Sequence, residues 1–158
     1  VVSNPRIKEG FSAEVIARRM DQACERILRL GEGWLTCCRA RHPEEVTEQL
    51  GALRQMASEK GRDPEKLSVA YQVTMHIGDS TASAHADFEE YIAKYYPELS
   101  KVLDLGEWGP VGSVEDIGDW IETFAKAGVD TFICRFGAAD QAGQAERFAR
   151  EVLPRFRD

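Results

Sequence analysis

The chain has 158 residues, which suits a single domain, and its 43% hydrophobic and 30% charged residues are ordinary values for a soluble globular protein. The net charge of −7 argues against a nucleic-acid partner, because binding to phosphates requires a basic surface. No apolar run approaches the roughly 20 residues that a membrane-spanning helix needs, so we expect neither a nucleic acid nor a membrane as a partner.

The cysteines and histidines show no pattern of a disulfide framework or a metal site. Adjacent cysteines make a poor disulfide, no CxxC pair is present, and three of the four cysteines lie in apolar runs or stripes, which favours buried free thiols: Cys24, Cys37, Cys38 and Cys134. Because no signal peptide is visible and reduced thiols are typical of the cytosol, we expect a cytoplasmic protein. The three histidines lack metal-ligand spacing, so no metal is expected.

The first half of the chain alternates strand and helix patterns. Residues 1–2 are β-branched and run into a Ser-Asn-Pro turn, as at the end of a strand. An apolar stripe at helical spacing predicts a helix over residues 12–30, and residues 33–38 read as a short buried strand. A second helix is predicted to begin at His42 and Pro43, where two acidic residues favour its positive end, and to stop at Gly61.

Residues 67–77 are the clearest strand, because large apolar and smaller or polar residues alternate strictly. The odd-numbered positions are expected to pack under helices. The even-numbered positions are expected to face a barrel interior or the mouth of a sheet: Ser68, Ala70, Gln72, Thr74 and His76. An antiparallel strand with one solvated face would show the same pattern.

The second half continues the alternation, with one interruption. Residues 81–96 are predicted to form a helix, a short helix begins at Pro97, and a glycine-rich loop over residues 106–112 holds Trp108. A capping box at Ser113 begins the next helix, which ends at Gly128. A strand over residues 129–136 and an amphipathic helix over residues 140–156 complete the chain.

This order predicts one α/β domain over residues 1–158, with parallel (β/α) units and helices packed outside the sheet. Four such units can form an open doubly wound sheet, although that fold more often carries five strands, or half of an eight-stranded barrel. Because Val1 and Val2 run into a turn as the end of a strand does, we favour a half or truncated TIM barrel.

Four local patterns, in their order along the chain, resemble the luciferase-like monooxygenase family. They are the Val-Val-Ser-Asn-Pro turn with its helix and the Leu-Gly-Glu-Gly-Trp-Leu segment that follows (residues 1–35), the Pro-Glu-Glu-Val helix with its Gly-Arg-Asp-Pro turn (43–64), the Gly-Ser-Val-Glu-Asp helix through Ala-Gly-Val-Asp (112–130), and the tail from Glu-Arg-Phe-Ala to Val-Leu-Pro (146–154). The resemblance covers almost the whole chain but only the family's C-terminal half. It departs at the first turn, where many members carry paired glycines.

The resemblance implies a (β/α)₈ barrel oxidoreductase or monooxygenase that uses FMN or a deazaflavin and acts on a small-molecule substrate. In such enzymes the cofactor carries the redox chemistry while the protein holds and shields it, so the sequence singles out no catalytic residue. The family's first turn lies against the cofactor's ring or phosphate. By resemblance, Ser3, Asn4 and Pro5 are candidate cofactor-binding residues, although a plain turn before a helix explains them equally well.

Three further residues are candidates at the same rim of the sheet. Arg135 ends the last strand and could bind a phosphate or an acidic substrate, which makes it a candidate cofactor-binding residue, or it could form a structural salt bridge. His76 could point inward into a substrate pocket as an acid, base or donor, or be a satisfied core histidine. Trp108 could close over a ring-shaped ligand in the pocket or only anchor its loop. We also expect Asn4 and Arg135 to lie close together.

Half a barrel would leave two unpaired edge strands and an unfilled inner face, which two copies could cover by pairing. We therefore expect a homodimer, and a chain that does not turn over substrate by itself. Two alternatives stay open: a non-catalytic half-barrel that binds flavin or dimerises, and an unrelated doubly wound domain of five strands.

Overall fold

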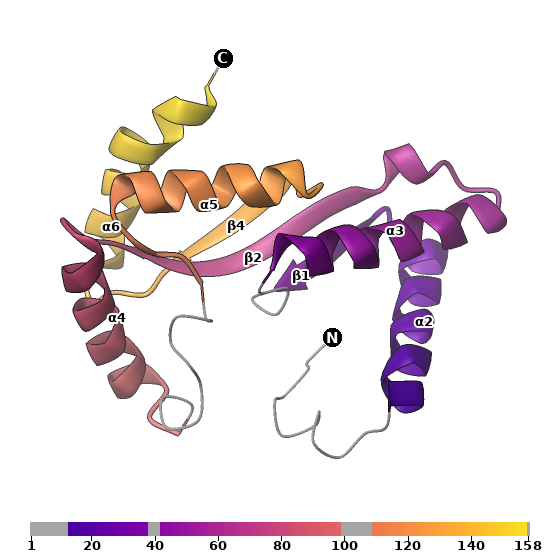
Figure 1. The fold of residues 1–158 in the computed structure, drawn as a ribbon, viewed down its shortest axis with the longest axis horizontal. Coiled ribbons are helices and arrows are strands. Elements are labelled where there is room, and N and C mark those ends of the chain that lie inside the picture. Colours follow the sequence, from indigo (N-terminus) through magenta and orange to yellow (C-terminus); the bar gives the residue numbers. More distant parts are fainter. Residues whose placement is uncertain (1–12, 38–41, 99–108, 158) are drawn as a thin grey trace.

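The computed structural model describes residues 13–37, 42–98 and 109–157 (Figure 1). The predicted first strand, the helix expected just after Pro97 and most of the glycine-rich loop with Trp108 fall largely outside the described residues. Within the described parts the helices are α2 (Ala13–Leu30), α3 (Pro43–Glu59), α4 (Thr81–Tyr95), α5 (Val114–Lys126) and α6 (Gln141–Arg147). The strands are β1 (Gly33–Cys37), β2 (Ser68–Ile77), β3 (Val111–Gly112) and β4 (Thr131–Phe136).

The strands form one parallel sheet with β2 at its centre. β1 pairs with the first half of β2, β4 pairs with it from Ala70 to Met75, and β3 pairs with its last two residues. The parallel arrangement predicted from the alternating pattern is therefore confirmed. The two-residue strand β3 was not expected, because two residues inside a glycine-rich loop are too few to show a period.

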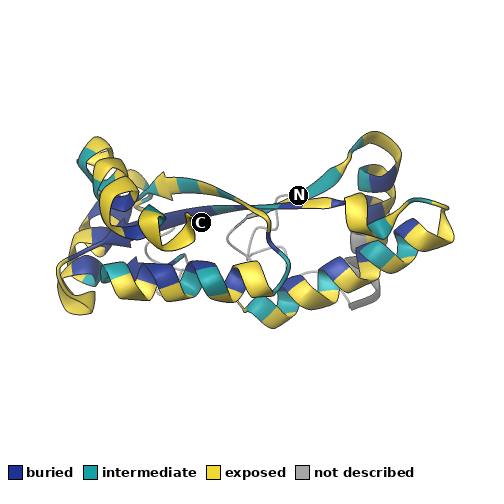
Figure 2. Cartoon of the chain, turned by 90° about the horizontal axis from the view of Figure 1, so that it is seen from above, coloured by how far each residue is buried: buried dark blue, intermediate teal, exposed yellow. Residues whose placement is uncertain are grey.

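One face of the sheet, called here the outer face, carries the main core. Odd-numbered residues of β2 pack against the apolar stripes of α3 and α5, and against the C-terminal helical segment, in a single cluster. Val69, Tyr71, Val73, Met75 and Ile77 are each no more than 2% exposed, which confirms the prediction for this strand. Figure 2 shows the result as dark blue patches on helices whose other residues are teal or yellow.

The position of the crossover helices separates the two fold classes that the sequence left open. α3 connects β1 to β2 and α5 connects β3 to β4, and both pack on the outer face. A doubly wound sheet places its crossover helices on both faces, whereas a barrel places them all outside. The described strands therefore have the layering of part of a (β/α) barrel.

The other face, called here the inner face, carries the even-numbered residues of β2 and their neighbours on β4. α4 was expected to pack outside the sheet like the other helices, and instead it covers the end of this inner face. Its Phe88 is fully buried and lies 6.4 Å from the His76 ring, measured between centroids. Gly78 and Gly137 leave the room that α4 needs, because a Cβ atom at Gly78 would meet Ala84 and one at Gly137 would meet Phe88. The sheet end and α4 thus form a second small core.

The N-terminal helix and Cys24 fit their predicted environments, Cys134 is half-buried rather than buried, and the Cys37 side chain and Cys38 lie outside what the structure describes. α2 packs on α3 through a cluster that contains Cys24 and Leu53, and the Arg62 guanidinium donates to the carbonyl oxygens of Leu28 (2.5 Å) and Gly31 (2.8 Å). Cys24 and Cys134 are free thiols, and burial raises the pKa of both. Gly61 (φ 72°) and Gly128 (φ 109°) follow the ends of α3 and α5 in the left-handed region, where glycine has no steric cost.

The last predicted helix is continuous but changes type. After α6, residues Phe148–Val152 form a π-helix and Leu153–Phe156 form a 3₁₀ helix. Pro154 explains the change, because its nitrogen cannot donate to a preceding carbonyl and its ring clashes with a regular α-helical turn. The Gln144 amide of α6 bonds both backbone groups of Ile77 at the end of β2, accepting from the nitrogen at 2.8 Å and donating to the oxygen at 2.9 Å.

The capping box predicted at Ser113 is present and ties two helices together. Asp116 accepts hydrogen bonds from the Ser113 backbone nitrogen (2.8 Å), the Ser113 hydroxyl (2.9 Å) and the Thr81 hydroxyl of α4 (2.9 Å). The bonds from Ser113 and then from Thr81 lower the pKa of Asp116 from its ordinary value of 3.8.

Asp116→Asn should therefore lower the free energy of unfolding at pH 7 by about 1 kcal/mol, the usual worth of a helix cap. A carboxyl with a lowered folded-state pKa stabilises the fold above its unfolded pKa and loses that contribution as the pH falls through the folded value. The two proteins should thus converge as the pH falls below 3.8, the ordinary value of the carboxyl, in urea unfolding followed by circular dichroism. A difference that stays constant with pH would show that ionisation of Asp116 does not matter.

Candidate functional site

The carboxyl ends of β2 and β4, with α4 packed over them, form the candidate site. They bring together Thr74 and His76 of β2, Arg135 of β4, Gly137 just beyond it, and Asp87 of α4. In parallel β/α folds this is the edge at which ligands bind. We call this cluster of residues the rim.

His76 is buried, 5% exposed, and both of its ring nitrogens face polar atoms. Nδ1 lies 3.0 Å from the carbonyl oxygen of Gly137, and because a carbonyl only accepts, Nδ1 carries a hydrogen and donates it. Nε2 faces the Asp87 carboxylate at 3.7 Å. The inward orientation expected for His76 is confirmed, and the ring joins β2, the end of β4 and α4. A role in a substrate pocket stays a prediction.

Arg135 lies beside Thr74 on the inner face, one residue before the end of β4. Its side chain is exposed, and its guanidinium donates to the hydroxyl of Tyr96, 3.2 Å away at the end of α4. The placement of Arg135 at the rim is therefore as predicted, whereas its cofactor role stays a prediction. The alternative, a structural salt bridge of Arg135, also stays a prediction.

Three tyrosines at the rim were missed by the sequence reasoning. The Tyr91 and Tyr95 rings stack with centroids 4.7 Å apart and an interplanar angle of 26°, and Tyr96 lies next to them. The Tyr91 hydroxyl accepts from the Gln141 side chain at 3.4 Å. The spacing of four residues between Tyr91 and Tyr95 was the available signal, since it places both rings on one side of a helix. It could not show that this side meets the inner face.

The candidates Ser3, Asn4, Pro5 and Trp108 lie outside the described residues. The expected proximity of Asn4 to Arg135 is therefore untested.

The rest of the inner face is less covered than its end. Leu35 of β1 is 58% exposed and Ile133 of β4 is 43% exposed, and both lie on the same face as Ala70 and Gln72 of β2. In a closed barrel such side chains would be buried by the other strands. The described sheet thus presents an open apolar surface next to the rim.

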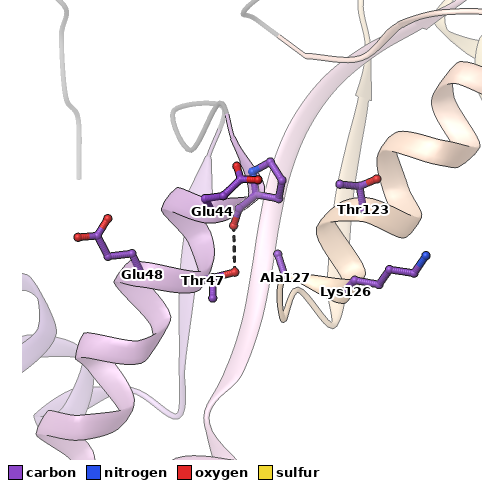
Figure 3. Close-up of a pocket in the computed structure, with 7 residues that line it drawn as sticks. Glu44, Thr47, Glu48, Thr123, Lys126 and Ala127 are labelled. Atoms are coloured by element: carbon purple, nitrogen blue, oxygen red, sulfur yellow. Dashed lines mark hydrogen bonds between the residues drawn. The ribbon is translucent and has the colours of Figure 1, made fainter.

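A shallow groove lies elsewhere, on the helical layer between the start of α3 and the end of α5 (Figure 3). Its lining is Pro43, Glu44, Thr47, Glu48, Thr123, Lys126 and Ala127. The Thr47 hydroxyl donates to the Pro43 carbonyl oxygen at 3.1 Å, as the dashed line in Figure 3 marks. None of the candidate cofactor or substrate residues borders this groove, so we do not assign the function to it.

Two further observations bear on the class of site. Within residues 13–37, 42–98 and 109–157, no three His, Cys, Asp or Glu side chains gather as metal ligands would. Across the same described ranges, no helix combines the length and the apolar character that crossing a bilayer requires.

Comparison with known proteins agrees with this architecture. The sequence profile of one family, described as luciferase-like monooxygenase, matches residues 15–110, more than half of the chain. No curated protein sequence gives a significant match.

Solved structures of similar fold include three redox enzymes or related proteins, each 17% identical to this chain. An F420-dependent secondary alcohol dehydrogenase in complex with an F420-acetone adduct superimposes with a TM-score of 0.70, over 87% of this chain and 46% of its own. A riboflavin lyase with modified FMN and riboflavin gives 0.63, over 83% and 39%. A coenzyme F420-dependent tetrahydromethanopterin reductase from Methanopyrus kandleri gives 0.62, over 85% and 48%. The chain therefore spans less than half of the length of each of these structures, and the fold is that of part of a TIM-barrel enzyme.

Proposed function

Because this chain belongs to the luciferase-like monooxygenase family, we propose that it is the C-terminal portion of a flavin- or deazaflavin-dependent oxidoreductase that acts on a small-molecule substrate. The observation that carries the proposal is the family match over residues 15–110, together with a parallel half-barrel layering whose strand ends gather polar and aromatic side chains. The cofactor would be FMN or a deazaflavin such as F420, the groups with which the similar structures above are described. We further propose that residues 1–158 are a single domain and that the protein is cytoplasmic.

The residues of the rim suit such a cofactor chemically. A bound flavin or deazaflavin would supply the transfer of hydride or the activation of oxygen. Arg135 would bind an anionic group, the cofactor's phosphate or an acidic substrate, and Ser3, Asn4 and Pro5 would contact the cofactor. His76, held by Gly137 and Asp87, and Trp108 would line the substrate pocket. Phe88 and the α4 backbone exclude water from the end of the inner face.

The open inner face supports a homodimer. Within the described part of the sheet, β1 and β4 each pair with β2 alone, so each has an edge that another strand can join, and Leu35 and Ile133 stand exposed between these edges. Two copies that pair through these edges would bury both apolar faces. A non-catalytic half-barrel that dimerises or binds flavin is the second candidate, and the share of the matched structures that the chain spans favours it.

We expect the purified chain to have a mass in solution near twice 17.7 kDa, and to bind flavin without steady turnover, because half of the family's pocket is missing. Sedimentation equilibrium, flavin fluorescence and oxygen-dependent oxidation of reduced flavin measure these three properties. Leu35→Lys combined with Ile133→Lys should convert the dimer to a monomer, whereas Leu30→Lys, at a residue that is 72% exposed on α2, should leave the mass unchanged.

The outcomes separate the candidates. Flavin binding with substrate-dependent oxidation by a stable monomer would show that this chain suffices for catalysis and that the dimer proposal is wrong. Binding without turnover, even with candidate substrates added, would favour the non-catalytic module. Failure to bind any flavin or deazaflavin would contradict both.

A further inference from the structure

The open inner face limits how two copies of this chain can meet. Leu35 of β1 and Ile133 of β4 lie on either side of β2 on this face, and they are 58% and 43% exposed. The outer face already carries α3, α5 and the C-terminal helical segment. A second copy that stabilises a dimer by burying apolar surface therefore has to cover the inner face.

Twofold arrangements differ in what they bury. If the two sheets continue edge to edge in one plane, an edge strand gains a partner but Leu35 and Ile133 stay in solvent. If the inner faces stack as flat layers, they have to approach to about 10 Å. Helix α4 stands on the end of this face and has a diameter of about 10 Å, so it keeps flat layers apart there. If the sheets instead curve around a common axis, both faces are buried and α4 lies at the mouth.

Closure around such an axis agrees with the strand directions. The pairs that the structure describes are all parallel, and a twofold axis along the strands leaves those of the second copy pointing the same way. Helices α3 and α5 then stay outside, as a parallel barrel requires. The chain spans 46% of the F420-dependent dehydrogenase, so two copies supply nearly the length of one such barrel.

We propose that two copies of this chain close one parallel barrel around a twofold axis along the strands, with both rims at the same mouth, so that both copies line a single pocket. The inference rests on the proposed function for the ligand of this pocket, and it adds the orientation of the partner and the sharing of the site. A flavin that lies across the twofold axis blocks the symmetry-related position. One flavin therefore binds for every two chains.

Distances between the copies test the orientation without any ligand. Asp79 follows the end of β2 and Lys66 precedes its start, and both side chains are exposed. Spin labels at Asp79→Cys and at Lys66→Cys give distances by double electron–electron resonance, in dimers of one variant and in dimers mixed from both. The unsubstituted chain, labelled in parallel, gives the contribution of its own thiols. Each label should lie nearer to its counterpart on the partner than to the other label, because the ten residues of β2 separate the two positions by about 33 Å.

The number of bound cofactors tests the sharing. Isothermal titration with FMN, or with F420 if FMN does not bind, should give one molecule for every two chains. Leu35→Lys combined with Ile133→Lys should be monomeric and should weaken this binding about tenfold or more, because each monomer offers half of the pocket. Leu30→Lys should keep the affinity and the stoichiometry, since α2 packs on α3 in the outer layer. Far-UV circular dichroism checks that each variant folds.

The two experiments separate this inference from the proposed function. A monomer, or labels that lie nearer to the other label on the partner than to their own counterpart, would overturn the shared barrel. One flavin bound to each chain would also overturn it, while the proposed flavin binding would stand. The expected distances without binding of FMN or F420 would support the shared mouth and contradict the proposed function.

Discussion

Replacing Phe88 by alanine should lower the free energy of unfolding by about 3–5 kcal/mol, the usual cost of removing a buried phenyl ring. Phe88 is fully buried and lies against His76 and Gly137. Its loss would leave a cavity that the rigid strand ends cannot fill. Urea unfolding monitored by circular dichroism measures the change.

Phe156→Ala is the matched control, because this phenylalanine is 38% exposed near the end of the chain. It should cost less than about 1 kcal/mol, since little apolar surface leaves water there. Equal losses for the two variants would mean that α4 does not pack on the inner face as described.

Gly78→Ala should destabilise the protein by about 1–3 kcal/mol, although it adds only one methyl group. The new Cβ atom would lie 2.7 Å from the backbone nitrogen and the Cβ atom of Ala84 and 2.8 Å from its Cα atom. Backbone cannot rotate away as a flexible side chain can, so the whole first turn of α4 would have to shift. The midpoint of urea unfolding reports the change.

Gly51→Ala provides the opposite result from the same chemical substitution. Gly51 lies inside α3 with no atom within 4 Å of an added Cβ, so alanine should stabilise the protein by about 0.5–1 kcal/mol through its better helix propensity. If both variants shift the midpoint in the same direction, the close approach of α4 to the end of β2 is wrong.

The sequence predicted those parts of the fold that local chemistry determines. The alternation in β2 defines which side chains are buried against helices, and the capping box at Ser113 and the glycine at position 128 define both ends of α5. Helical and strand periods are visible over ten or more residues. Parallel layering follows from the order of these elements, because a crossover between parallel strands needs a helix.

The parts of the fold that the sequence did not predict depend on contacts between segments that are distant along the chain. The apolar stripe of α4 would look the same in the sequence whether the helix packed outside the sheet or over its inner face. The close approach of α4 to Gly78 and Gly137 decides between these two positions, and the sequence of neither segment alone shows it. The site shows the same division. Arg135 and His76 were placed at the rim because each lies near the end of a strand, whereas Tyr96, which accepts from Arg135, caps α4 and depends on its position.

The end of β2 depends on α6 for its hydrogen bonding, because the Gln144 side chain makes two hydrogen bonds with the backbone of Ile77. A side-chain amide here substitutes for the neighbouring strand, since β4 pairs with β2 only as far as Met75. The backbone amide of Ile77 is therefore shielded from deuterium exchange by a residue of α6 and not by the sheet. The exchange rate of the Ile77 amide therefore reports how often the C-terminal helical segment separates from the end of β2. The amides of Tyr71 and Val73 point toward β4, so their exchange rates report the opening of the sheet itself.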